Sequence, residues 1–210
     1  AVVAGQTFTL TTGLDNKTLG AGADQAFATD SATAADDTFN PSDKVDGGAG
    51  DDTFYLTLSD TAAEADVEYT PSRLTNFETL SVTNIDESDT LDINVSLMGL
   101  SGIENAASSS PVTVTGATAG TTLTATGNTA DTSLEVLGAG LTGADDTAVI
   151  SLTGNSGAIN YTSSTAQDIE KAAFTVTGIN SGAITITDSG GNSAVKSATV
   201  SGSGSYDMTT

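Results

Sequence analysis

The sequence predicts an all-β protein made of many short strands. Apolar residues alternate with Thr and Ser in bursts of roughly four to six residues, and Gly, Asn, Ser and Asp separate the bursts. Stretches with the 3.6-residue period of a helix are almost absent. Aromatic residues make up only 5 % of the chain, which indicates a thin core, because Ala, Val, Thr and Ile cannot fill a wide interior at normal packing density.

The strand bursts continue from Phe77 onward and begin roughly 10 to 15 residues apart. We expect them to form a β-solenoid of short strands, with a β-sandwich as the alternative, because spacing alone does not separate the two folds. The segments Leu74–Leu80, Leu100–Ala106 and Ala166–Ala172 align as a weak internal repeat, which favours stacked units. The bursts are Leu80/Val82, Leu91/Ile93/Val95, Val112/Val114, Leu134/Val136, Ile150/Leu152, Ile159/Tyr161, Phe174/Val176, Ile184/Ile186 and Ala198/Val200.

The composition changes along the chain. Ten of the 20 Asp residues fall within residues 1–60, whereas the later chain is rich in Thr, Ser, Gly, Ala and β-branched residues. We therefore expect a calcium-binding, β-roll-like segment over 1–60 and a Thr/Ser/Val-rich β-strand repeat region over 61–210.

The charge balance excludes several classes of function. With 5 basic and 27 acidic residues, the formal net charge is −22, so we expect no nucleic-acid partner. Such self-repulsion disfavours compaction, and divalent cations would relieve it. Without Cys or His, the chain has no disulfide, thiolate ligand, imidazole ligand or histidine general base. We expect no membrane insertion, because no apolar run reaches about 18 residues.

One segment carries a specific chemical pattern. Residues Gly47–Tyr55 fit the nonapeptide G-G-x-G-x-D-x-U-x, in which U is apolar, at every constrained position. The glycines reach backbone angles closed to other residues and turn carbonyl groups inward, while Asp52 adds a carboxylate. Hard Ca²⁺ prefers six to eight such oxygen ligands. Phe54 is then expected to begin a short strand and fill the core, although a solvated hairpin loop is the simpler interpretation of such a turn.

A single turn supplies only half of a coordination shell, so a second copy must stack on it. Two partial copies lie nearby: Leu19–Phe27 keeps two glycines and Asp24, and Ala32–Asn40 keeps Asp36 and Asp37 but no glycine. We expect one or two Ca²⁺ ions, and the neighbouring carboxylates Asp46 and Asp51 are further candidate ligands.

These residues resemble bacterial surface-layer and related proteins of the repeats-in-toxin class, which are exported by type I secretion. The resemblance rests on Thr7–Gly13, the Gly47–Phe54 nonapeptide and the Leu74–Val82 segment with its Thr/Val-rich sequel. It implies calcium-dependent folding outside the cell and lattice assembly, with ligand positions at Gly48, Gly50 and Asp52, and through the partial copies at Asp24 and Asp37. The chain departs from the class because it has no tandem array of nonapeptides.

We therefore expect a structural segment of a secreted surface-layer protein at the cell surface, which self-assembles with Ca²⁺. The alternative is a calcium-stabilised adhesin segment that binds glycans or other cells, with cell-surface polysaccharide as partner. An enzyme is not expected. The pairs Asp36/Asp37, Asp51/Asp52 and Asp145/Asp146 could supply acid and base, but adjacent strand residues point to opposite faces and few basic groups would stabilise an anionic transition state.

Overall fold

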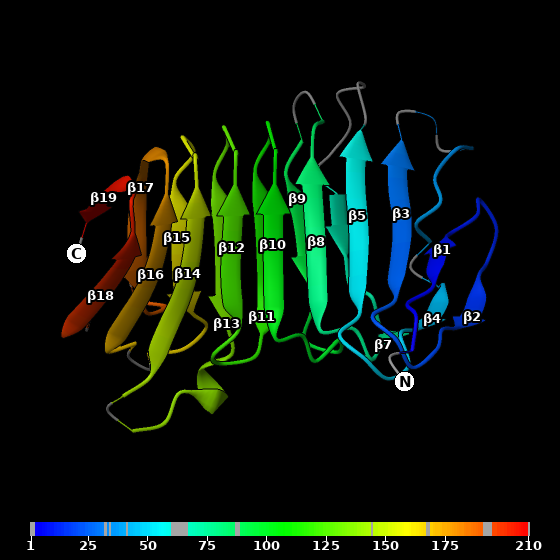
Figure 1. The fold of residues 1–210 in the computed structure, drawn as a ribbon, viewed down its shortest axis with the longest axis horizontal. Helices are drawn as coiled ribbons and strands as arrows, with labels where there is room; N and C mark the ends of the chain where they lie inside the picture. Colours follow the sequence, from blue (N-terminus) through cyan, green and yellow to red (C-terminus); the bar gives the residue numbers. More distant parts are fainter. Residues whose placement is uncertain are drawn as a thin grey trace.

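The computed structural model describes residues 3–31, 33, 35–40, 42–59, 67–86, 89–143, 145–166, 169–190 and 195–209. Through these residues the chain winds into a parallel β-solenoid of about seven turns (Figure 1). The all-β prediction is confirmed, and the fold is a solenoid, not a sandwich. The expected boundary between residues 60 and 61 lies outside the described residues.

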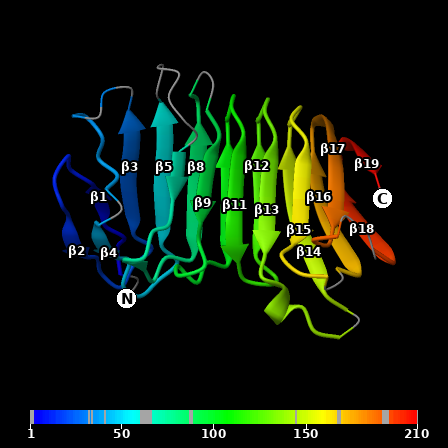
Figure 2. The ribbon, with the colours of Figure 1, turned by 180° about the vertical axis from the view of Figure 1, so that it is seen from behind.

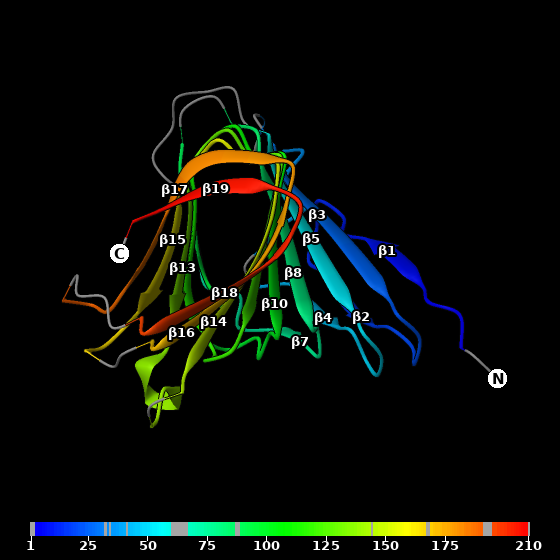
Figure 3. The same ribbon diagram turned by 60° about the vertical axis from the view of Figure 1, so that its left-hand side comes forward.

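Nine parallel strands form the front sheet, seven form the back sheet, and three short strands form a side sheet. Figure 2 shows the back sheet from behind, and Figure 3 shows the two large sheets as facing walls. The front sheet contains β1 (Thr7–Thr9), β3 (Gln25–Ser31), β5 (Thr53–Ser59), β8 (Thr79–Asn84), β10 (Gly102–Ala106), β12 (Thr122–Thr126), β14 (Thr147–Thr153), β16 (Lys171–Thr177) and β18 (Ser197–Gly202).

The back sheet contains β6 (Val67–Tyr69), β9 (Leu91–Asn94), β11 (Val112–Ala117), β13 (Thr132–Val136), β15 (Ile159–Ser163), β17 (Ile179–Thr187) and β19 (Ser205–Thr209). The side sheet contains β2 (Asn16–Thr18), β4 (Lys44–Asp46) and β7 (Leu74–Thr75), and a short 3₁₀ helix spans Gly138–Gly140. Among the described strands the side sheet ends at β7, and from β8 onward the strands alternate between the front and back sheets. In the part of the chain described here, no helix is long and apolar enough to cross a membrane.

The core consists of rows of inward side chains that stack from coil to coil. In the front sheet one row runs through Ala26, Phe54, Leu80, Ile103, Leu123, Ile150 and Phe174, each at most 2 % exposed. Outward positions carry mainly Thr and Ser, which explains the period-two pattern. Because the row crosses from β5 to β8, the two compositional segments share one sheet and one hydrophobic core.

Every burst predicted from alternation lies in a strand except for Val95, which follows the last residue of β9, but two front strands after Phe77, β10 and β12, were not among the bursts. In β10 the inward position after Ile103 is occupied by the polar Asn105, and in β12 the position after Leu123 is the small Ala125. The predicted repeat alignment was also wrong. It placed Leu80 opposite Ala106, whereas the structure pairs Leu80 with Ile103, a shift of three residues.

Buried polar side chains form a row along the corner of the coil that follows the ends of the front strands. The Asn128 carboxamide oxygen accepts the Ser108 N–H at 2.8 Å, Asn155 accepts the Asn128 N–H at 3.0 Å, and Asn180 accepts the Asn155 N–H at 2.9 Å. These three Asn are at most 4 % exposed. Each side chain therefore satisfies a backbone donor of the preceding coil at a corner where the strand ladder is interrupted. We call this row the asparagine ladder.

Candidate functional site

The Gly47–Asp52 turn joins the side sheet to the front sheet, between β4 and β5. It stacks on the partial copy at Gly20–Gly22, as the sequence predicts for a two-turn site. Gly48 has a φ of +96°, and a Cβ at this position would lie 2.1 Å from the Gly20 carbonyl oxygen. A Cβ on Gly50 would come equally close to the carbonyl oxygen of Gly22. The two glycines are required because the turns approach each other through bare backbone.

Three carboxylates from successive coils lie in register at this corner. The Asp52 Oδ1 accepts the Asp24 N–H at 2.7 Å, and the Glu78 Oε2 accepts the Asp52 N–H at 2.6 Å. The Asp24 carboxylate accepts the N–H groups of Gln6 and Gly20, each at 2.5 Å. We call Asp24, Asp52 and Glu78 the carboxylate ladder. Each member holds the start of the neighbouring front strand, so the ladder has a structural role in the absence of any ion.

Asp52 is the member of the carboxylate ladder whose hydrogen bonding is incomplete. It is 1 % exposed, and its second oxygen, Oδ2, has no hydrogen-bond partner in the described structure. A Cβ placed on Gly47 would lie 2.8 Å from this oxygen and 2.0 Å from the carbonyl oxygen of Asn76. Gly47 is therefore required here, because the Asn76 carbonyl oxygen and the Asp52 Oδ2 both come too close to its Cα to leave room for a side chain. A buried acceptor without a donor is costly, and a cation would satisfy it.

The electrostatics of this corner favour a positive partner. Burial raises the pKa of the Asp52 carboxyl above its ordinary 3.8. The Asp24 N–H opposes that shift, while the charges of Asp24, Glu78 and Asp51 raise the pKa further. The ionised carboxylate is thus disfavoured here without a counterion. A bound divalent cation would invert this balance by stabilising the ionised form.

The structure gathers most of the predicted ligands but not all of them. Gly48, Gly50, Asp24, Asp46 and Asp52 meet at the corner, and Asp51 lies beside them on the exposed side of the turn. The Asp46 Oδ1 accepts the Gly48 N–H at 3.1 Å and the Asn76 side-chain N–H at 2.8 Å.

Asp36 and Asp37 do not belong to the site. The Asp37 carboxylate accepts the Ser31 N–H at 2.9 Å, at the end of β3 opposite to Asp24. The seven residues of β3 separate the two positions by about 20 Å. Residues 35–40 of the partial copy keep the Asp-Asp-Thr-Phe end of the motif but occupy a different corner of the coil.

Sequence reasoning missed Glu78 and Asn76. They belong to the third turn of this corner, which is three residues shorter than the Gly47–Asp52 turn and has no glycine. Asn76 adopts a φ of +54°, a conformation that Asn tolerates better than most residues. The usable signal was the position of Glu78 directly before β8, which matches the position of Asp52 before β5.

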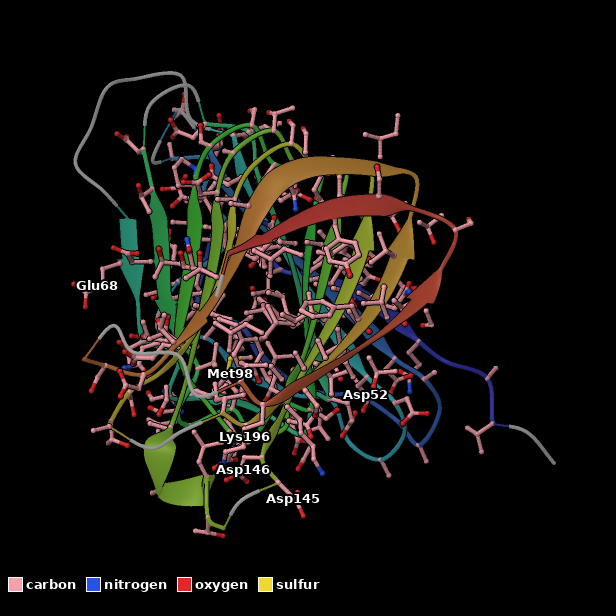
Figure 4. The ribbon with its side chains drawn as sticks, turned by 90° about the vertical axis from the view of Figure 1, so that its left-hand side faces the viewer. Asp52, Glu68, Met98, Asp145, Asp146 and Lys196 are labelled. Atoms are coloured by element: carbon pink, nitrogen blue, oxygen red, sulfur yellow. The ribbon has the colours of Figure 1, made fainter. Side chains whose placement is uncertain are left out.

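The residues fit a cation only in part. The Asp52 Oδ2 and the Asn76 carbonyl oxygen would hold it, with Glu78 as a neighbouring carboxylate and water completing the shell. Within the described ranges, no group of three or more Asp or Glu side chains is arranged to hold a metal ion. The other acidic pair is remote: Figure 4 shows Asp145 and Asp146 apart from Asp52, and Asp145 forms an ion pair with Lys171 at 2.7 Å.

A second feature lies on the outer face of the front sheet. The rings of Phe27 and Tyr55 stack with centroids 4.6 Å apart and planes within 5°, and both are half-buried on the solvent side. Two strands further along, a shallow hollow forms where Gly102 interrupts the outer row of hydroxyl side chains. Its lining includes Thr79, Ser101, Glu104, Thr122 and Thr124.

Comparison of the chain with protein families, with curated proteins and with solved structures finds no match in any of the three.

Proposed function

We propose that this chain is a calcium-stiffened structural segment of a secreted bacterial surface-layer protein, which assembles with further copies at the cell surface. The observation that carries the proposal is the buried Asp52 Oδ2, which lacks a donor and lies beside Gly47 together with the Asn76 carbonyl oxygen. The net charge of −22 supports it, because bound divalent cations reduce the self-repulsion of the folded chain. A regular, thin solenoid suits a load-bearing role.

The test compares unfolding in Ca²⁺ with unfolding in excess chelator. At a free Ca²⁺ concentration of about ten times Kd, one site that exists only in the folded chain adds about 1.4 kcal/mol to the free energy of unfolding. For an extracellular module this concentration lies at roughly 1 to 10 mM. Light scattering of the same samples reports whether the chain assembles.

Asp52→Asn and Asp51→Asn form a matched pair, because each removes one charge from adjacent residues of the same turn. The Asp52 variant should lose the Ca²⁺-dependent gain, and the exposed Asp51 variant should keep most of it. Equal stability of the native chain in Ca²⁺ and in chelator would refute calcium stiffening. A stability gain without particle growth would retain the calcium site and reject self-assembly by this segment alone.

The outer face of the front sheet favours a second candidate, a glycan-binding adhesin segment. The stacked Phe27 and Tyr55 side chains offer apolar contact to sugar rings, and the hydroxyl-lined hollow beside Glu104 offers hydrogen bonds. The net charge of −22 would select neutral over anionic polysaccharides. Binding to a glycan array in saturating Ca²⁺ that disappears in Tyr55→Ala would favour this candidate, and a silent array would reject it.

A further inference from the structure

Three tripeptides in the chain have the form Asn-X-Ser/Thr, the acceptor sequence for N-linked glycans. They begin at Asn16, Asn94 and Asn160. A fourth, at Asn40, is excluded because Pro41 occupies the middle position. In a chain so rich in Ser and Thr such tripeptides arise by chance, so the structural setting has to separate them.

Asn160 and Asn16 lie in strands. Asn160 is in β15, which is paired on both sides by β13 and β17, and its Nδ2 donates to the Ser133 hydroxyl at 3.3 Å. Asn16 begins β2, the edge strand of the side sheet, which pairs with β4 alone, and its side chain is exposed. Modification of Asn160 would therefore require local opening of the ladder, which costs free energy, whereas Asn16 is reachable without it.

Asn94 lies where its strand leaves the sheet. It is the last residue of β9, and β6 pairs with β9 only as far as Ile93, so one side of Asn94 has no described strand. The chain then turns through Ser96 and Leu97, and the Leu97 side chain is 59 % exposed. Both the acceptor and the hydroxyl two residues later are therefore reachable.

The turn presents the carboxamide of Asn94 with its nitrogen available. The Asn94 Oδ1 accepts the Ser96 N–H at 3.0 Å, which fixes the side chain through its oxygen. No hydrogen bond of its Nδ2 is found within the described ranges. Gly116 makes room for this arrangement: its φ is +76°, and a Cβ there would lie 2.8 Å from the Asn94 Oδ1.

A polar hollow adjoins the acceptor. It is lined by Glu68, Asp92, Asn94, Thr113 and Thr115, together with Ile93. Its carboxylates and hydroxyls offer partners for the hydroxyl groups of a first sugar residue. Glu68 lies on the opposite side of the coil from Asp52 (Figure 4), so a glycan here would not cover the candidate calcium corner.

We propose that Asn94 is the acceptor of an N-linked glycan transferred from an activated sugar diphosphate. The Asn94 Nδ2 forms a bond to the sugar C1, the C1–O bond to the diphosphate breaks, and the diphosphate leaves with the electron pair. The amide proton passes to a base of the transferase. The donor is either a polyprenyl-diphosphate-linked oligosaccharide or a nucleoside diphosphate sugar. The proposal is independent of calcium binding.

The experiment incubates the purified, folded chain in two arms. One contains a bacterial oligosaccharyltransferase with a synthetic polyprenyl-diphosphate-linked oligosaccharide, and the other contains a soluble N-glycosyltransferase with UDP-glucose. Intact mass and peptide mapping locate the sugar. Occupancy of Asn94 should exceed that of Asn160 by about tenfold or more, because Asn160 is paired on both sides and can be modified only after local opening. The difference should shrink in urea.

Variants separate the acceptor role from a structural role. Asn94→Gln should abolish the modification, and Ser96→Ala should abolish it while keeping the backbone N–H that holds the Asn94 Oδ1. Modification in the lipid-linked arm alone assigns the lipid-linked donor, and modification in the UDP-glucose arm alone assigns the nucleotide sugar. Absence of sugar at Asn94 in both arms, or equal occupancy of Asn94 and Asn160 in the folded chain, would overturn the proposal.

Discussion

The asparagine ladder allows a direct test of what holds the coils together. Asn155 is 2 % exposed, its Oδ1 accepts the Asn128 N–H at 3.0 Å, and its Nδ2 donates to the Ala125 carbonyl oxygen at 2.6 Å. Asn155→Ala leaves the Asn128 N–H buried without this acceptor and removes one donor from the Ala125 carbonyl oxygen, which also lies in the β12–β14 ladder. An orphaned buried donor costs about 1 to 3 kcal/mol, so the free energy of unfolding should fall by about that amount.

Asn160→Ala is the matched control in the same coil. Asn160 is half-buried on the outer face, and its side chain makes one hydrogen bond, to the Ser133 hydroxyl at 3.3 Å. Water can replace that bond, so the expected cost is below about 1 kcal/mol.

Urea titrations followed by circular dichroism measure the free energy of unfolding of both variants. The slope m of the two variants is compared first, because stacked coils can unfold in stages and free energies are comparable only when m is unchanged. If Asn155→Ala costs no more than Asn160→Ala, the ladder does not hold the corner and the argument fails.

Three further perturbations test the core and the Gly47–Asp52 turn. Phe54→Ala should lower the free energy of unfolding by about 3 to 5 kcal/mol, because Phe54 is fully buried. Phe27 lies half-buried on the outer face, so Phe27→Ala should cost less than half of that in the same urea assay. Gly48→Ala should lower the free energy of unfolding by about 1 to 3 kcal/mol, because the φ of Gly48 is +96° and the new Cβ would meet a carbonyl oxygen. The control Gly13→Ala should be near neutral, because its Cβ meets only a side-chain oxygen at 3.8 Å. Similar melting temperatures for the two variants would contradict the stacked turn. The third concerns pH in chelator: because the folded pKa of Asp52 is raised, its ionisation costs stability, so its contribution should be most favourable below about pH 3.8 and decline as pH rises through the folded pKa. Asp52→Asn should remove this decline and leave the chelated protein at least as stable as the native chain at pH 7, and a steeper decline in the variant would refute the assignment.

Alternation in the sequence was sufficient to find most strands, because a strand with one face in the core must place every second residue there. It failed where the inward position is polar or small, as at Asn105 and Ala125. The asparagine ladder escaped notice for a related reason. Asn128, Asn155 and Asn180 recur 27 and 25 residues apart in segments that read as ordinary turns, and only the stacked backbone shows that their side chains point inward.

In the candidate site, too, the sequence determined some features and the tertiary structure determined others. The nonapeptide by itself determined that Asp52 follows a glycine turn and precedes a buried Phe54, because both requirements are local. The acidic, Cys-free and His-free composition likewise restricted the metal chemistry to oxygen ligands. Only the tertiary structure decided which carboxylates meet Asp52. Glu78 joins the ladder and Asp37 does not, because membership depends on which residues fall in register when coils of unequal length stack, and no local sequence pattern encodes that register.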